Sequence, residues 1–444
     1  MEQIGLVLNQ ISTALWGLPM AILLLGAGFF LNIRTGFFPL RHLSLWLRQT
    51  FLDLFRKRGD TGVTPFKAMA TALGTTAGTG NIVGVGTAIV LGGPGAVFWM
   101  WIAALFGMAI KYTEVVLAMR YRQSEKSNPY GGPMYYIEKG LNSRKLAALF
   151  ALLGALAAFG IGNWVQSSAA VESMQSAFSL PPMVMGIILL ILCFFATSGG
   201  ISRIANVSAL LVPAMTLIYM LGCVAILFIE RANIISSLAA IFTQALSPDA
   251  ALGGATGYSI LLAMRAGLAR GLFSNEAGMG TSPIAHAASN AQNPVEQGMW
   301  GIFEVFIDTL IICTMTALTI LVSDANSALE AFSIGFGPIG EGFVALSVSA
   351  FALSSIIGWL FYGQRFVGYL TQEDKKSQTL YRLLFLAVIP LGALGVPTAL
   401  WNLADILNAF MALPNLVALV LLCGEVTKET QRYLSKRPSM RRRA

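Results

Sequence analysis

Long apolar runs alternate with short polar and charged segments along almost the whole chain. Most runs have about 20 residues or more, which is enough to cross about 30 Å of hydrocarbon as a helix. The ten-residue segments of alternating polarity that build membrane β-barrels are absent from the sequence. The pattern therefore predicts an all-α polytopic membrane protein with about eleven transmembrane helices. The spans fall at roughly 14–33, 65–91, 95–119, 145–170, 182–200, 203–229, 258–287, 297–322, 342–370, 381–400 and 403–424.

The spans form two sets of five, with one extra span at the N-terminus. Each of spans seven to eleven begins about 200 residues after its counterpart among spans two to six. Because five is an odd number, the two sets must cross the membrane in opposite senses, which predicts a 5+5 inverted repeat. The division that follows is an N-terminal span with a cytoplasmic amphipathic helix (1–64), a first repeat (65–230), an external loop (231–257), a second repeat (258–425) and a basic cytoplasmic tail (426–444).

Composition and charge fit this organisation. The chain is 56% hydrophobic and 11% charged, with a mean hydropathy of +0.70, whereas soluble domains carry about 25% charged residues. The net charge of +8 could suggest a nucleic-acid partner, but 25 of the 29 basic residues lie in loops on one side of the predicted topology. By the positive-inside rule, the N-terminus is external and the C-terminus cytoplasmic. We therefore expect a multi-pass protein of the plasma (inner) membrane whose partner is the lipid bilayer and not a nucleic acid.

The sequence offers little for catalysis or a resident cofactor. Its four cysteines lie in apolar segments without a CxxC pair, and its two histidines are far apart. A membrane enzyme would need a nucleophile–base pair or a metal cluster, so we expect no enzyme and no cofactor.

One polar motif interrupts an apolar span in each repeat. Asn81-x-x-Gly84-x-Gly86-Thr87 recurs as Asn275-x-x-Gly278-x-Gly280-Thr281. Unwound backbone costs several kcal/mol per unsatisfied group in an apolar medium and survives in a membrane only where it is buried in protein or lines a cavity. Two broken helices side by side would offer N–H groups to anions and carbonyls to cations. Tight packing of small residues is the alternative.

Two segments resemble a known family of carriers. TALGTTAGTGNIVGVGTAIVLGGPGAVFWMW (71–101) and GLARGLFSNEAGMGTSPIAHAAS (267–289) are similar to the alanine or glycine:cation symporter family, the sodium:alanine symporters or bacterial amino acid carrier proteins. The resemblance implies a leucine-transporter-like fold and the import of a small neutral amino acid, alanine and/or glycine, by sodium symport through alternating access. A proton-coupled carrier and a glutamine- or serine-type carrier of the same fold remain alternatives; a channel is less well supported, because channels usually repeat as parallel subunits around a pore.

The resemblance also implies a set of site residues. The amino acid would lie at Thr79, Gly80 and Asn81 and face Phe273, Ser274, Asn275 and Glu276, while the Gln166 amide donates to its carboxylate. Sodium would be bound by Ser354 and Ser355 with the carbonyls of Gly80 and Val83. An interhelical hydrogen bond is the alternative for Gln166, a structural cap for Glu276, and bonding to the preceding turn for the serines.

Several charged residues inside the spans have no assigned role. Lys111 and Glu114, three residues apart, are interpreted as an ion pair on a helix surface. Glu304 and Asp308 are candidates for a gate or a proton relay. Arg265 and Arg270 are expected to pair with carboxylates near the outer gate.

Overall fold

The computed structural model describes residues 2–54, 62–123, 129–246, 255–395 and 397–436. These residues form helices almost throughout, with two isolated β-bridges, Val63 to Ser289 and Gln123 to Tyr130. The all-α prediction is therefore confirmed.

The α-helices, in chain order, are α1 (Glu2–Leu15), α2 (Leu18–Arg34), α3 (Phe38–Arg41), α4 (Leu43–Leu54), α5 (Pro65–Thr76), α6 (Val83–Gly92), α7 (Gly95–Arg120), α8 (Pro133–Gly140), α9 (Arg144–Phe159), α10 (Val165–Phe178), α11 (Pro182–Thr197), α12 (Gly200–Ile229), α13 (Ile234–Leu246), α14 (Ala255–Asn275), α15 (Pro283–Ala287), α16 (Pro294–Val305), α17 (Thr314–Val322), α18 (Ala328–Phe336), α19 (Pro338–Leu370), α20 (Lys375–Val388) and α21 (Thr398–Ser435). The 3₁₀ and π segments are η1 (Thr79–Asn81), η2 (Gly160–Trp164), η3 (Arg231–Asn233), η5 (Phe306–Cys313) and η6 (Ile389–Leu394).

Eight helical stretches of the described residues are long and apolar enough to cross a membrane. They correspond to eight of the eleven predicted spans, so a multi-pass membrane protein is confirmed but the number eleven is not. Of the other three predicted spans, the second and the seventh are broken helices, and the fifth is the short apolar helix α11. Length and hydropathy alone do not identify a span whose helix is interrupted.

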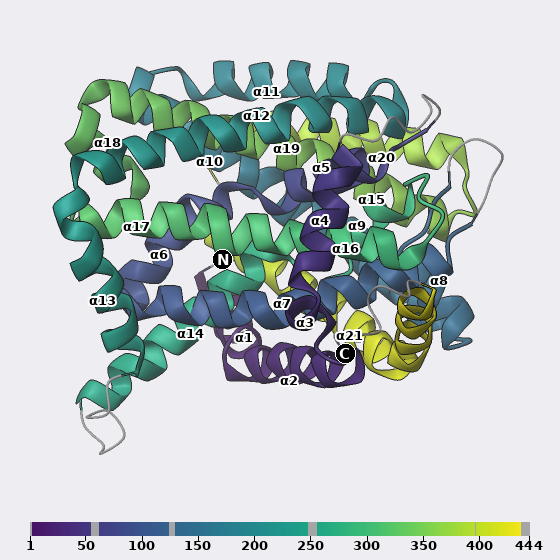
Figure 1. The fold of residues 1–444 in the computed structure, drawn as a ribbon. Coiled ribbons are helices and arrows are strands. Elements are labelled where there is room, and N and C mark those ends of the chain that lie inside the picture. The colour runs from purple at the N-terminus through teal and green to yellow at the C-terminus, as the bar shows by residue number, and fades with distance from the viewer. Residues whose placement is uncertain (1, 55–61, 124–128, 247–254, 396, 437–444) are drawn as a thin grey trace.

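Figure 1 shows α2, α7, α12 and α17 running in roughly the same direction, while α4 runs across that direction. This α4 is part of the predicted amphipathic segment 38–57, of which residues 55–57 lie outside the described residues. It packs against Phe303 of α16. The centroid of the buried Trp46 ring lies 6.5 Å from that of Phe303, and the Phe51 centroid lies 5.9 Å from that of Phe303. The predicted amphipathic helix is thus anchored on the helix bundle by its aromatic side chains.

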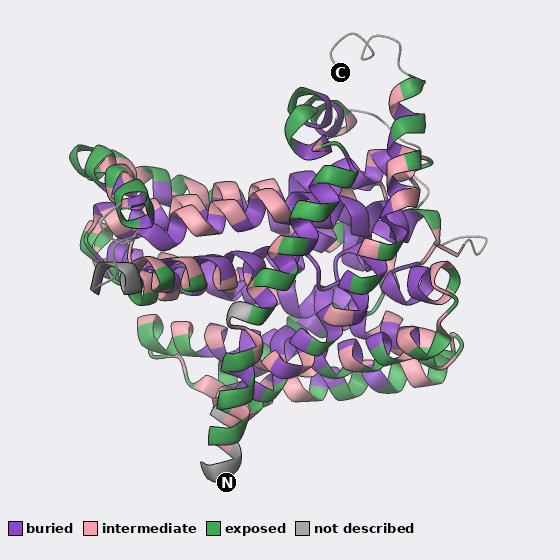
Figure 2. Cartoon of the chain, turned by 90° about the horizontal axis from the view of Figure 1, so that it is seen from below, coloured by how far each residue is buried: buried purple, intermediate pink, exposed green. Residues whose placement is uncertain are grey.

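Buried residues concentrate where the long helices pack together, as Figure 2 shows, and exposed apolar side chains cover the outer helices. Small residues permit the closest of these contacts. A Cβ at Gly271 of α14 would lie 3.0 Å from the Ala103 Cβ and 3.1 Å from the Met100 Cα of α7. The packing role of small residues is therefore real at this crossing, and it brings α14 against α7 along the wall of the site described next.

Candidate functional site

The first repeat motif breaks a helix between Thr76 and Val83. Helix α5 begins at Pro65 behind Thr64, whose hydroxyl accepts the Lys67 N–H at 3.3 Å, and it ends at Thr76. The last carbonyls of a helix lack an intrahelical partner. Here those of Gly74 and Thr75 accept the hydroxyl of Ser355 from α19, at 3.2 and 3.1 Å.

Gln166 of α10 satisfies a donor freed by the same break. Its Oε1 accepts the Thr79 N–H at 3.4 Å and the Thr79 hydroxyl at 3.2 Å, while its Nε2 donates to the Ile161 carbonyl at 3.4 Å. The Gln166 amide thus contacts Thr79, one of the candidate substrate residues. In this structure the contact is the interhelical hydrogen bond that the sequence analysis gave as the alternative role of Gln166.

The second repeat motif breaks a helix between Asn275 and Pro283. Glu276, Gly278 and Gly280 have φ of 50°, 90° and 78°, the left-handed region that favours glycine. Three such residues in five end α14, and a Cβ at Gly278 would also lie 2.6 Å from the Leu24 Cδ2 of α2. Both predicted breaks therefore exist. The second coincides with its motif, whereas the first ends at Ile82, so that Gly84, Gly86 and Thr87 of its motif lie in α6.

Glu114 of α7 holds the unwound backbone of the second break. Its Oε1 accepts the N–H groups of Gly278 and Gly280 at 3.1 and 3.0 Å and the Asn415 amide at 2.6 Å. The same Asn415 amide donates to the Gly278 carbonyl at 2.8 Å, and the Tyr136 hydroxyl hydrogen-bonds to its Oδ1. A carboxylate that accepts several N–H groups is one of the strong hydrogen-bond arrangements in proteins.

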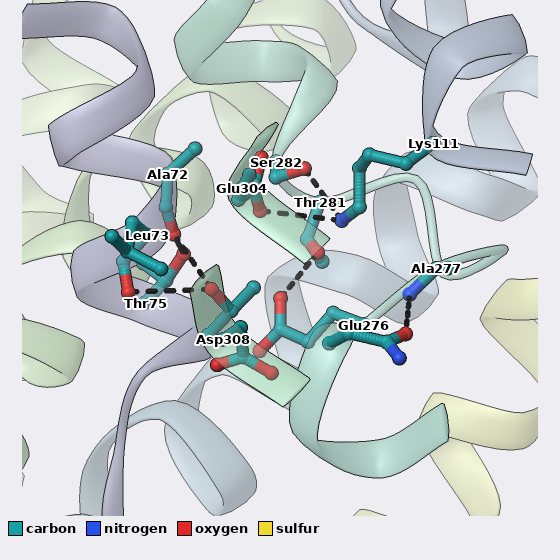
Figure 3. A network of polar contacts seen from close by, with 12 residues as sticks. Ala72, Leu73, Thr75, Lys111, Glu276, Ala277, Thr281, Ser282, Glu304 and Asp308 are labelled. Carbon is teal, nitrogen blue, oxygen red and sulfur yellow. Dashed lines mark hydrogen bonds and ion pairs between the residues drawn. The ribbon is translucent and has the colours of Figure 1, made fainter. Parts of the chain in front are cut away.

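The prediction of a Lys111–Glu114 ion pair on a helix surface was wrong. Both residues are fully buried. Lys111 instead donates to the Ser282 hydroxyl at 2.7 Å and pairs with Glu304 of α16, with 3.5 Å between Nζ and Oε1. Figure 3 shows this lysine reaching across the second break from α7.

The two breaks lie side by side. A Cβ at Gly80 would be 3.9 Å from the Phe273 Cδ1 and 3.9 Å from the Ser274 Cα. The Asn81 amide donates to Asp308 Oδ1 at 2.8 Å, and the Ser274 hydroxyl donates to Asp308 Oδ2 at 2.8 Å. The structure thus joins the candidate residues of both repeats around Asp308, which lies in the π-helical segment η5, a type of distortion frequent at functional sites.

Glu276 and Asn275 lie within the second break itself. The Glu276 carboxylate is buried and accepts the Thr281 hydroxyl at 2.5 Å, as Figure 3 shows. Asn275 donates to the Thr309 hydroxyl at 3.3 Å, and its Oδ1 accepts the Ala277 N–H at 3.0 Å. Both side chains therefore stabilise the turn in this structure.

The structure places the proposed sodium ligands differently. Ser354 and Ser355 are buried on α19 against the end of α5, and the Ser354 hydroxyl has no hydrogen-bond partner among the described residues. Val83 already belongs to α6; its side chain is 52% exposed and its carbonyl accepts the Thr87 hydroxyl at 3.0 Å. The carbonyls that contact a proposed serine ligand are those of Gly74 and Thr75, not that of Val83.

Sequence reasoning did not foresee two of the polar contacts that surround the breaks. Asp308 was only a gate or relay candidate, and the partnership of His286 with Glu304, at 2.8 Å between Nε2 and Oε2, was not foreseen. Gln297 lies 2.7 Å from the other nitrogen of that imidazole. The sequence did contain a signal for these four residues, because polar and charged residues within membrane spans are costly and usually have a function.

Comparison with known proteins shows the family of the chain. The model of the sodium:alanine symporter family matches residues 1–443. The chain is 38% identical over 449 residues to the sodium/alanine symporter AgcS of Methanococcus maripaludis, with 98% of each chain covered. It is 36% identical over 428 residues to the probable sodium/glutamine symporter GlnT of Bacillus subtilis, with 94% of this chain and 88% of that relative covered.

Solved structures share the fold at low sequence identity. A sodium-coupled sialic acid symporter superposes with a TM-score of 0.56 at 13% identity and covers 90% of this chain and 98% of its own. A manganese transporter of Eremococcus coleocola gives a TM-score of 0.55 at 13% identity, with 80% and 76% covered. These neighbours have the leucine-transporter-like fold, as the family resemblance implied. The chain belongs to the sodium:alanine symporter family, whose members are transporters and not enzymes.

Proposed function

We propose that this protein imports a small neutral amino acid, alanine and/or glycine, together with sodium by alternating access. The observation that carries the proposal is the meeting of the two broken helices, where Gly80 lies against Phe273 and Ser274. Broken half-helices near the midplane present N–H groups to the anionic end of a substrate and carbonyls to cations. An amino acid zwitterion needs both.

We propose that the α-carboxylate binds at the first break, at Thr79, Gly80 and Asn81. The start of α6 directs its N–H groups and the positive end of its dipole towards that place. Glu276 and Asp308, both buried, supply the negative charge that would attract the ammonium group. Phe273 closes the space beside Gly80, so the bound side chain must be small.

We propose that the coupling ion binds between the end of α5 and the serines of α19 that face it. Sodium is a hard cation and takes oxygen ligands, as other hard cations do. Ser354 offers a buried hydroxyl without a partner among the described residues, and Ser355 contacts the carbonyls of Gly74 and Thr75. We propose these four groups as ligands, in place of a set that includes Gly80 and Val83.

The test is uptake into proteoliposomes that contain the purified protein. Labelled alanine, glycine, serine and glutamine are supplied separately, each with an inward sodium gradient, with an inward proton gradient without sodium, and with neither gradient. We expect saturable accumulation of alanine and glycine against their gradient only when sodium is present. Accumulation driven by protons alone would contradict sodium coupling, and preference for glutamine would contradict the small site. Uptake that equilibrates without accumulating would indicate a channel.

We further propose that the protein lies in the plasma membrane with its N-terminus external. The support is the distribution of basic residues, which lie almost entirely in loops of one side.

A further inference from the structure

A cavity lies beside the broken helices and is lined in part by Phe273, whose ring also lies next to Gly80. Its volume is about 320 Å³, within the range of small-molecule sites, which is roughly 300–1,000 Å³. It lies between α14, the start of α21 and the N-terminal segment where α1 meets α2. Its lining includes Thr13, Trp16, Arg265, Arg270, Trp401 and Asp405.

The polar groups of this cavity have both signs of charge. Arg265 and Arg270 lie five residues apart on α14. Asp405 of α21 lines the same cavity and interacts electrostatically with Arg270. Guanidinium groups have the geometry to bind a carboxylate through two hydrogen bonds. A carboxylate in the same cavity favours an ammonium group. The lining therefore offers a partner of opposite charge to each end of a small zwitterion.

Aromatic rings separate this cavity from the broken helices. The Phe273 ring contacts Gly80 on one side, with 3.9 Å to the Cβ position, and meets the Trp16 ring edge-on at a centroid distance of 6.2 Å. Trp16 is held in place because its indole N–H donates a hydrogen bond to the backbone carbonyl of Asp405 at 2.9 Å. The extra N-terminal segment thus contributes a wall of the cavity and supports the ring that divides it from the central site.

We propose that this cavity is an outer binding site for the amino acid substrate, occupied before the central site. Arg265 and Arg270 bind the α-carboxylate, Asp405 binds the ammonium group, and Trp16 and Trp401 form the apolar wall. The N-terminal span, which stands outside the 5+5 repeat, therefore takes part in substrate capture. The inference rests on the proposed function, because it assumes that the substrate is an amino acid.

A cysteine-protection experiment tests the outer site separately from the central one. Thr13 is exposed and lines the cavity, and all four native cysteines are buried, so a Thr13→Cys variant offers one reactive thiol. The rate of its modification by a hydrophilic maleimide is measured in purified protein with and without alanine. Ethylamine and propionate serve as matched probes that each lack one of the two charges. The same measurement is made in a Gly80→Val background, in which the central site is filled.

We expect alanine to slow the modification several-fold in both backgrounds, with ethylamine and propionate much weaker. Adding Asp405→Asn, or separately the exposed Arg265→Gln, should remove the protection; the two substitutions provide independent tests if one of them impairs folding. Protection that disappears in the Gly80→Val background would assign the effect to the central site and overturn the outer site, while leaving the proposed function intact. Absence of protection in every background would also overturn the outer site. In that case alanine binding to the wild-type protein by calorimetry decides separately whether the proposed function stands.

Discussion

The Glu114 carboxylate accepts the backbone N–H of Gly280 at 3.0 Å and so ties α7 to the second broken helix. Gln166 makes the corresponding contact at the first break, where it accepts the Thr79 N–H at 3.4 Å. At each break, a polar side chain from another helix accepts a hydrogen bond from a backbone N–H group that has no partner within its own helix. The unwound segments are therefore stabilised by the fold itself, through side chains that need not touch the substrate.

Replacing Glu114 with Ala should destabilise the protein strongly. The substitution leaves the N–H groups of Gly278 and Gly280 and the Asn415 amide without their shared acceptor, and each unsatisfied buried group costs about 1–3 kcal/mol. We expect a lower melting temperature in detergent and weaker alanine binding. Glu172→Ala, which removes an exposed carboxylate, is the control. Equal melting temperatures for the two variants would show that Glu114 does not hold the break.

The buried Lys111–Glu304 pair should behave unlike an ion pair at the surface. Removing one partner leaves an uncompensated buried charge, which typically costs 3–5 kcal/mol, whereas an apolar or neutral replacement of both is often tolerated. Lys111→Met and Glu304→Gln should therefore each lower the melting temperature more than the double variant does. The partly exposed pair Arg120–Glu425 is the comparison, and its removal should cost about 0–1 kcal/mol. Additive losses at Lys111 and Glu304 would contradict the pairing.

The serine pair on α19 should set the sodium dependence of transport. Replacing Ser354 and Ser355 with Ala removes two hydroxyl ligands and little volume, so half-saturating sodium should rise strongly in the proteoliposome assay. Ser349→Ala on the same helix is the control, because its hydroxyl is occupied by the Ala345 carbonyl at 2.8 Å. If the double variant and the control show the same sodium dependence, the cation binds elsewhere.

The proposed topology can be tested by labelling one residue on each side of the membrane. Ser236 of α13 and Ser435 at the end of α21 are both exposed, and the four native cysteines are buried. An impermeant maleimide should modify Ser236→Cys in intact cells, but Ser435→Cys only after permeabilisation. The reverse order would invert the topology and would contradict the assignment of the cavity beside Trp16 and Arg265 to the outer side.

The sequence could predict the breaks because their cause is local. Asn and Gly interrupt an otherwise apolar run, and the cost of unwound backbone in lipid makes that interruption meaningful without knowledge of any contact. The recurrence of the motif at Asn81 and Asn275 then indicated that the two breaks would meet. The spans were predictable for a similar reason, since hydropathy acts along the chain.

The partners of the breaks could not be predicted, because they come from distant segments. Glu114 and Gly278 are 164 residues apart, and no local pattern links them. Spacing on α7 suggested a surface pair, but residues 107–119 are buried all around the helix, so there is no solvent-facing side. The placement of Val83 away from the serines has a different cause. A motif does not show at which residue a helix ends, and the end of α5 at Thr76 exposes carbonyls earlier in the chain.

Alanine binding to the purified protein, measured by calorimetry in sodium buffer, tests most directly whether the two breaks form the substrate site. The comparison is between the wild type, Gly80→Val and the control Gly26→Val, which adds the same side chain in α2 where nothing lies within 4 Å of the new Cβ. Valine at position 80 extends methyl groups towards Phe273 and Ser274, so we expect its affinity to fall by roughly tenfold or more, or about 1.4 kcal/mol and upward. The control should bind alanine as the wild type does, and wild-type affinity together with wild-type stoichiometry in Gly80→Val would contradict a substrate site between the broken helices.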